Sequence, residues 1–166
     1  MAVFGVVFIA IIIGLVLIVL LKQTSPPIPQ EKVYFNTPED KPAYLREREA
    51  FKAKCLAFLA KFNLEYRHSI WADDNEVEIE MVDETPVVGG RYLALGLFEP
   101  AHNLVGLHKV TGFLETIKAE GASRGIIITT GYFSHDAIQA AQGESVELVD
   151  VASFLVYLKK FGIYEN

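Results

Sequence analysis

The chain opens with an unbroken apolar segment. Every residue from Ala2 to Leu21 is apolar or glycine, and the first charged side chain is that of Lys22. At a rise of roughly 1.5 Å per residue, about 20 helical residues span the ~30 Å hydrocarbon core of a bilayer. No Lys or Arg precedes this run, which is unlike the basic start of a cleaved signal peptide. We therefore predict a transmembrane anchor over residues 1–22.

The basic residues nearest the anchor all lie on its C-terminal side, at Lys22, Lys32 and Lys41. Because basic flanks are retained in the cytoplasm, this pattern predicts a single-pass protein with its N-terminus outside and its domain in the cytoplasm. Residues 23–42 are polar and rich in proline, which predicts an extended stalk. The remainder, 43–166, is the predicted folded domain.

Beyond the stalk, the spacing of apolar residues changes from one segment to the next. Thr37 and Pro38 are typical of a helix start, and the apolar stripe from Phe51 to Phe62 recurs at helical spacing. Further helical spacing occurs from Leu107 to Ile117, from Ser134, and from Val151 to Phe161. Five segments are predicted to be strands, namely 64–70, 77–81, 92–98, 125–130 and 146–149.

The order of these elements predicts the fold class. The first two strands alternate apolar and polar residues and are predicted to be antiparallel neighbours, whereas strand 92–98 is apolar throughout and is predicted to be central. The later strands alternate with helices, which favours parallel crossovers. We predict an α/β domain with a mixed five-stranded sheet flanked by helices, preceded by one transmembrane helix. Asp150 is predicted to cap the last helix, with Gly162 beyond its end.

Charge and cysteine content narrow the possible functions. The net charge of −6 and the pI near 5.2 argue against non-specific DNA binding through a broad basic surface, although a local basic groove is compatible with them. Cys55 is the only cysteine, which excludes an internal disulfide and a cysteine-rich zinc site. Its place in the helical apolar stripe predicts a buried core position.

One strand–turn–helix corner carries candidate chemistry. Strand 125–130 ends in Thr129, Thr130 and Gly131, and Ser134 is placed to cap the next helix. Exposed amides at such a corner can hold an anion. A corner with a helix cap and no ligand is the alternative, and the local pattern alone favours it.

The same corner lies in a longer pattern. Gly121-Ala122-Ser123-Arg124-Gly125 leads into the strand, Thr129-Thr130-Gly131-Tyr132-Phe133-Ser134 follows it, and an alanine-rich helix precedes Val146-Glu147-Leu148-Val149-Asp150. This pattern resembles the C-terminal half of the Mrr-like (type IV) restriction endonuclease domain family. The resemblance covers Gly106 to Phe161 well, and it implies a restriction-endonuclease-like fold that agrees with the predicted topology.

The resemblance also implies where a nuclease site would lie, and the chain departs from it there. Family members carry a metal-binding aspartate in the second strand and a Glu or Gln, one residue, then Lys in the third. The Gln and Lys positions fall on Leu95 and Leu97, which bind neither metal nor phosphate. The aspartate position falls in Glu76 to Asp83, where Glu76, Glu78 and Glu80 line one face of the strand. Glu78 and Glu80 are the residual candidates for the aspartate; alternatively, the three acids form a solvated strand face paired with Arg67. We therefore assign no catalytic residue from the sequence and predict no metal site.

Nuclease activity would still be possible if a lysine on the helix after the third strand replaced the missing strand lysine. Lys109 and Lys118 are the candidates, and magnesium is implied only if cleavage survives. Residues considered for nucleic-acid or anion binding are Thr129, Thr130, Gly131, Ser134, Lys109 and Arg124.

Three functions follow from these observations. The first in rank is a membrane-anchored, catalytically inactive domain that serves as an interaction or accessory module of a membrane-protein complex. The second is an Mrr-like DNA-binding relic that does not cleave. The third is a magnesium-dependent DNA endonuclease with migrated active-site residues. We thus expect no enzymatic activity, and a hydrolase acting on DNA if there is one.

Overall fold

The computed structural model describes residues 33, 41–86, 89–99 and 103–164. The predicted anchor, most of the stalk and the helix start expected at Thr37 lie outside these residues. Within the part that is described, no helix is both long enough and apolar enough to cross a membrane. The described domain belongs to one compact unit, Lys32–Asn166.

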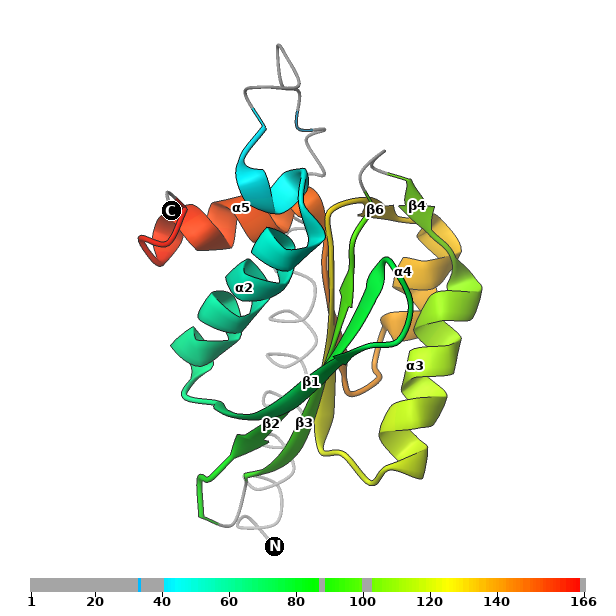
Figure 1. The fold of residues 1–166 in the computed structure, drawn as a ribbon. Coiled ribbons are helices and arrows are strands. Elements are labelled where there is room, and N and C mark those ends of the chain that lie inside the picture. Colours follow the sequence, from blue (N-terminus) through cyan, green and yellow to red (C-terminus); the bar gives the residue numbers. More distant parts are fainter. Residues whose placement is uncertain (1–32, 34–40, 87–88, 100–102, 165–166) are drawn as a thin grey trace, which may run out of the picture. The chain divides into compact units, whose positions relative to one another are not determined.

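A mixed five-stranded sheet runs through the middle of the domain (Figure 1). Its strands are β1 (Glu65–Trp71), β2 (Glu76–Asp83), β3 (Gly90–Leu97), β5 (Arg124–Thr129) and β7 (Val146–Val149), in the spatial order β1-β2-β3-β5-β7. Both β1 and β3 are antiparallel to β2, whereas β3, β5 and β7 are mutually parallel. The five predicted strands, the antiparallel first pair and the central position of the third strand are confirmed.

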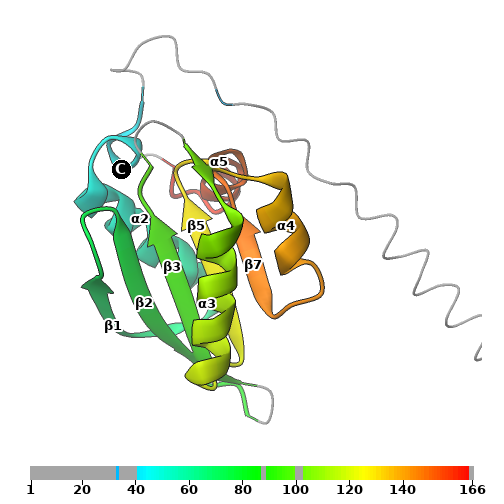
Figure 2. The same ribbon diagram turned by 90° about the vertical axis from the view of Figure 1, so that its right-hand side faces the viewer.

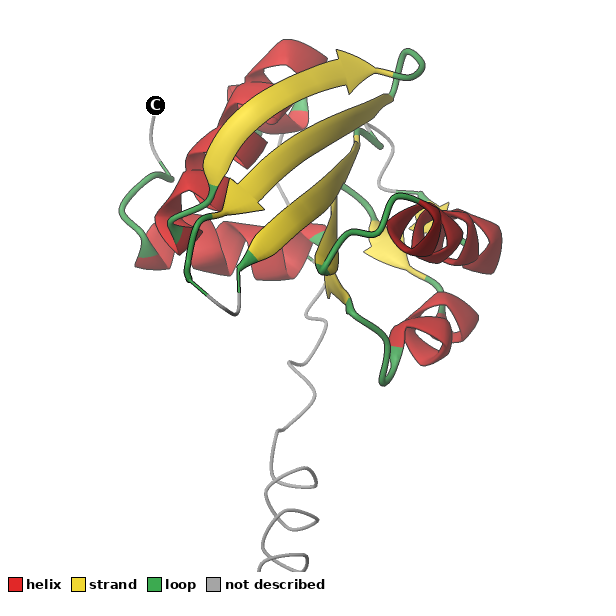
Figure 3. Ribbon diagram, turned by 90° about the horizontal axis from the view of Figure 1, so that it is seen from below, coloured by secondary structure: helices red, strands yellow, loops and turns green. Residues whose placement is uncertain are grey.

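Helices cover both faces of this sheet (Figure 2). The helices α2 (Arg48–Leu59) and α5 (Val151–Lys160) lie on one face, and α3 (Leu107–Ala119) and α4 (His135–Ala141) lie on the other. Short 3-10 helices, η2 (Ala43–Leu45) and η3 (Ala60–Phe62), flank α2. Figure 3 shows the strands twisting between the two helical layers, as strand geometry requires.

Each face of the sheet has its own apolar cluster. Cys55 packs in the larger cluster with Phe51, Phe58 and Phe154 between the sheet and helices α2 and α5. Their rings meet mainly edge to face, as the 5.5 Å contact of Phe58 with Phe154 illustrates. The predicted core position of Cys55 is confirmed, and its burial raises the pKa of the thiol well above the usual range.

A two-stranded parallel sheet, which the sequence pattern did not predict, joins the two loops at the top of the domain. It consists of β4 (Leu104–Val105) and β6 (Tyr132–Phe133). Both strands are only two residues long, so no alternation of apolar and polar residues can reveal them. They fix the loop after β3 against the corner after β5.

Asp150 caps α5, as its position in the sequence predicts. Its carboxylate accepts a hydrogen bond from the backbone amide of Ser153 at 2.8 Å, and the residue is only 4% exposed. The helix then ends before Gly162, whose φ of 67° lies in the left-handed region that glycine adopts readily. Both ends of α5 are therefore fixed by local sequence.

We predict that Asp150→Ala lowers the free energy of unfolding by about 1 kcal/mol or more, because a buried helix start loses its acceptor. Asp150→Asn keeps a side-chain oxygen at the same place and is the matched control. Urea unfolding of both variants, followed by circular dichroism, checks this. Equal stability of the alanine variant and the wild type would show that the cap is unimportant.

Candidate functional site

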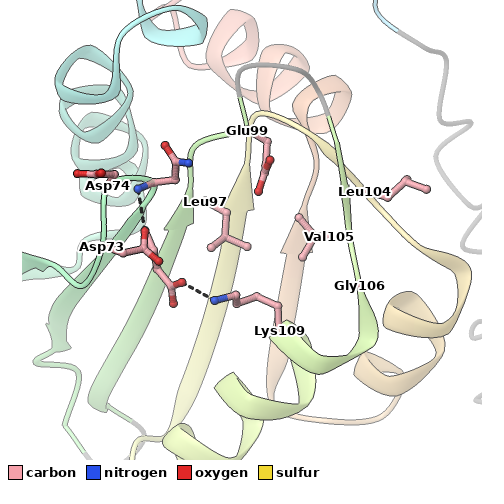
Figure 4. A pocket seen from close by; sticks show the side chains of 10 residues that line it. Asp73, Asp74, Leu97, Glu99, Leu104, Val105, Gly106 and Lys109 are labelled. Carbon is pink, nitrogen blue, oxygen red and sulfur yellow. Dashed lines mark hydrogen bonds and ion pairs between the residues drawn. The ribbon is translucent and has the colours of Figure 1, made fainter.

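A cleft of about 470 Å³ lies where β2 begins and β3 ends, against the first turn of α3 (Figure 4). Its walls come from the β1–β2 turn, the end of β3, the loop after it and α3. The lining residues are Asp73, Asp74, Asn75, Glu76, Leu97, Glu99, Leu104, Val105, Gly106 and Lys109. This is the end of the sheet at which the family resemblance places a nuclease site.

An ion pair crosses the cleft. Glu76 is the first residue of β2, and its carboxylate contacts the Nζ atom of Lys109 on α3 (Figure 4). The Glu76 side chain is 15% exposed and that of Lys109 is 45% exposed, so the pair is partly shielded from solvent. The backbone of Glu76 faces Leu97 across the β2–β3 ladder. Lys109 therefore brings its charge to the strand end where the family would place a lysine.

The two family positions on β3 are part of the core. Leu95 is 3% exposed and Leu97 is 4% exposed. Both pack in the second apolar cluster, with Val110 and Phe113 of α3 and Ile127 of β5. Polar groups at these positions would be unpaired in an apolar layer, which is costly. In this domain, the two strand positions at which the resemblance places catalytic groups are therefore occupied by buried leucines.

The other acids on β2 have separate surroundings. Glu80 accepts hydrogen bonds from Nε of Arg91 at 2.8 Å and from Nη2 at 3.0 Å, and Arg91 also pairs with Glu120 at 2.7 Å. The hydrogen bond from Arg91 is the main reason that the pKa of the Glu80 carboxyl is lowered. Glu78 is exposed and lines a neighbouring, smaller pocket between β2 and α3, next to Leu95.

The alternative in which these acids pair with Arg67 is only partly met, because the charge of Arg67 contributes to lowering the pKa of Glu80 but its direct contacts are with other acids. Arg67 contacts Glu65 at 3.4 Å and Glu84 at 3.3 Å instead. The register of β1 shifts between Tyr66 and His68, at a bulge that period-two alternation does not reveal. His68 takes the place opposite Glu80 and lies 3.4 Å from its carboxylate.

The Thr129–Gly131 corner is held by internal hydrogen bonds. Thr129 Oγ1 accepts from the amide of Gly131 at 3.0 Å, and Thr130 Oγ1 accepts from the amide of Glu99 at 2.6 Å. Both threonines are completely buried. A Cβ atom on Gly131 would lie 2.3 Å from the carbonyl oxygen of Asn103, so the close approach of these two loops requires glycine. Ser134 caps α4 by accepting from the amide of Ala137 at 3.2 Å.

The residues considered for anion binding do not converge on one place. The corner lies at the end of β5, whereas Arg124 is the first residue of the same strand and lines a different cavity. Lys109 faces the acidic cleft. Lys118 pairs with Glu144 at 3.4 Å. The predicted set therefore combines fold-forming residues with two cations at opposite ends of the sheet.

Three further acids border the cleft and were not among the predicted site residues. Asp73 accepts from the amide of Asn75 at 2.7 Å, Asp74 contacts Arg48 at 3.2 Å, and Glu99 accepts from Asn103 at 3.3 Å. Their positions in the sequence could have indicated them, because Asp73 and Asp74 lie in the turn before β2 and Glu99 closely follows β3. Strand ends at one edge of a sheet commonly bring such side chains together.

The cleft does not fit a magnesium ion. No group of three or more His, Cys, Asp or Glu side chains in the described ranges is arranged to hold a metal. Glu76, the acid of β2 that reaches the cleft, is neutralised by Lys109, and leucines occupy the positions from which β3 would supply a second ligand. Hard cations need several oxygen ligands, and these residues do not supply them together.

Comparison with known proteins agrees with this geometry at the level of the fold. Residues 97–158 match the family model Mrr_cat, described as Restriction endonuclease. The solved structure of the DNA modification-dependent restriction endonuclease AspBHI is similar, with a TM-score of 0.54 and 17% sequence identity. The domain has a restriction-endonuclease-like fold.

The similarity to AspBHI covers 82% of this chain and 41% of that one. The MspJI restriction endonuclease, solved in complex with a 27-mer oligonucleotide, matches with a TM-score of 0.46 and 13% identity, over 71% of this chain and 29% of that one. This chain therefore spans less than half the length of either enzyme. None of the curated proteins compared with it is significantly similar.

We predict that Leu95→Ala lowers the free energy of unfolding by about 2–4 kcal/mol, because a buried leucine leaves a cavity in a packed layer. Ile70→Ala is the control, since Ile70 is 58% exposed on β1 and its truncation is expected to change stability by under about 0.5 kcal/mol. Denaturant unfolding of both variants is the measurement. A small, equal effect for the two would mean that β3 is not packed as described.

Proposed function

We propose that this domain is a non-cleaving relative of the restriction endonucleases that serves as an interaction or accessory module. We further propose that residues 1–22 anchor it in a membrane, with the N-terminus outside and the domain in the cytoplasm, where a membrane-protein complex is its partner. The apolar run and its basic C-terminal flank are the support for this placement.

The burial of Leu95 and Leu97 is the observation that carries the proposal. Metal-assisted hydrolysis of a phosphodiester needs carboxylates that hold the ion and a group that positions water or phosphate. In this domain the corresponding stretch of β3 is packed beneath α3, with 3% and 4% exposure at the two leucines. Side chains in this environment stabilise the core and are not available to bind a metal ion or to position water or phosphate.

The charge of the cleft favours a protein partner over DNA. Four carboxylates, of Asp73, Asp74, Glu76 and Glu99, line it with one lysine, which is already paired with Glu76. Phosphate binding depends on unpaired Lys and Arg side chains. A cleft with this excess of negative charge repels the backbone of a duplex.

A magnesium-dependent endonuclease with a displaced lysine is the second candidate. One observation favours it, because the Nζ atom of Lys109 reaches Glu76 from α3, beside Leu97. In that case the pair would be the remnant of an active centre rather than a structural contact. A DNA-binding relic that does not cleave is the intermediate possibility.

A cleavage assay separates these functions. The full chain, purified in a mild non-ionic detergent, is incubated with plasmid DNA and Mg²⁺ or Mn²⁺. Plasmids with and without modified bases are both used, since the similar AspBHI is named a modification-dependent enzyme. We expect no cleavage above that of the Glu76→Gln and Lys109→Gln variants. Metal-dependent nicking that both substitutions abolish, but that Glu115→Gln and Lys61→Gln retain, would establish the second candidate.

A further inference from the structure

A second cavity lies at the other end of the sheet from the acidic cleft. It has a volume of about 400 Å³, within the range of small-molecule sites. It forms where β3 and β5 begin, below the C-terminal end of α2, whereas the acidic cleft lies where β3 ends. The site is therefore separate from the candidate nuclease cleft, and the inference drawn from it is independent of the function proposed above.

One part of the cavity wall is apolar and aromatic. Leu59 and Ile126 are buried at its floor, while Phe62 is 47% exposed and Tyr92 is partly buried. An aromatic ring left half exposed beside a cavity provides a flat surface for another apolar group. The shape and lining suit a ligand with a bulky apolar body.

Two opposite charges line the same cavity without contacting each other. Arg124 begins β5 and Glu147 lies on β7, where its backbone neighbour in the ladder is Ile126. Among the described residues, neither side chain takes part in an ion pair or a hydrogen bond. Both residues are exposed, so their charges are open to a ligand that carries the two complementary charges.

Tyr92, which lines the cavity, feels both charges. Burial is the main cause that raises the pKa of its phenol; Glu147 raises the pKa further and Arg124 lowers it. The third charged residue of the lining, Asp83, is already engaged, since its Oδ1 accepts from the amide of Thr85 at 2.9 Å and from its hydroxyl at 2.5 Å. The charge of Arg124 also contributes to lowering the pKa of the Asp83 carboxyl. Arg124 and Glu147 are nevertheless the charged side chains of the lining that have no hydrogen-bond partner among the described residues.

We propose that this cavity binds a free α-amino acid with a bulky apolar side chain. The carboxylate of the ligand pairs with the guanidinium of Arg124, in the two-pronged geometry that arginine offers. The ammonium group pairs with Glu147, and the side chain packs against Phe62 and the apolar floor. Peptide ends are poorer ligands, because an internal peptide bond removes one of the two charges.

Calorimetric titration of the full chain in lipid nanodiscs with L-phenylalanine tests this proposal, with empty nanodiscs subtracted. We expect saturable binding that Arg124→Gln and Glu147→Gln each weaken by about tenfold, the effect of losing one charge-assisted hydrogen bond. Phe62→Ala is expected to weaken binding through lost apolar contact. Arg46→Gln and Glu115→Gln, at exposed positions outside the cavity, are matched controls with unchanged affinity.

Two analogues assign the charges. 3-Phenylpropanoate lacks the ammonium group, so Glu147→Gln should not weaken its binding. 2-Phenylethylamine lacks the carboxylate, so Arg124→Gln should not weaken its binding. Circular dichroism confirms that each variant is folded. The proposal is overturned by the absence of saturable phenylalanine binding, by equal affinity of wild type and Arg124→Gln, or by equal affinity of the amino acid and both analogues.

Discussion

The packing of β3 on both of its faces is the constraint on which the rest of the domain depends. Leu93, Leu95 and Leu97 face α3, while Ala94 and Phe98 belong to the cluster beneath α2 and α5. Gly96 lies between them, and a Cβ there would come within 2.6 Å of Val77 and 3.2 Å of Phe51. The strand therefore joins two apolar layers, and any polar group placed in its second half would interrupt one of them.

This packing also determines what the neighbouring cleft can do. With leucines beneath the cleft, its charged groups come only from strand ends, turns and the first turn of α3. Glu76 and Lys109 satisfy each other, while Asp73 and Asp74 are exposed and Glu99 is partly buried. A site for phosphodiester cleavage needs charges held in place and left unsatisfied for the reaction. The domain has the restriction-endonuclease-like fold, while the pairing of Glu76 with Lys109 differs from such an arrangement of charges.

Much of the fold could be predicted from the sequence because its signals are local. Alternating residues marked β1 and β2, the unbroken apolar run marked β3, and Asp150 marked the start of α5. Five strands in the right order followed from the spacing of apolar residues. The contacts that shape the site could not be predicted in this way. Lys109 meets Glu76 only after α3 packs beside β2, and Arg91 meets Glu80 only once the register of β2 and β3 is set.

At the Thr129–Gly131 corner, too, contacts between sequence neighbours could be predicted and contacts between distant residues could not. Ser134 was predicted as a helix cap from its own neighbourhood, and it acts as one. The threonines of the corner looked available in the sequence, yet Thr130 is engaged by Glu99, 31 residues away. The predicted anchor, residues 1–22, lies outside the described structure, so the membrane placement stays a prediction.

Manganese titration followed by NMR is the most direct test of the claim that the nuclease centre has been replaced by packed core. Mn²⁺ broadens the amide signals of residues close to where it binds. With leucines at positions 95 and 97 and Glu76 paired with Lys109, we expect the amides of Glu76, Leu97 and Glu99 to broaden no more than those beside isolated surface acids such as Glu115. Selective, saturable broadening at Glu76 and Leu97 that Glu76→Gln abolishes would contradict this claim.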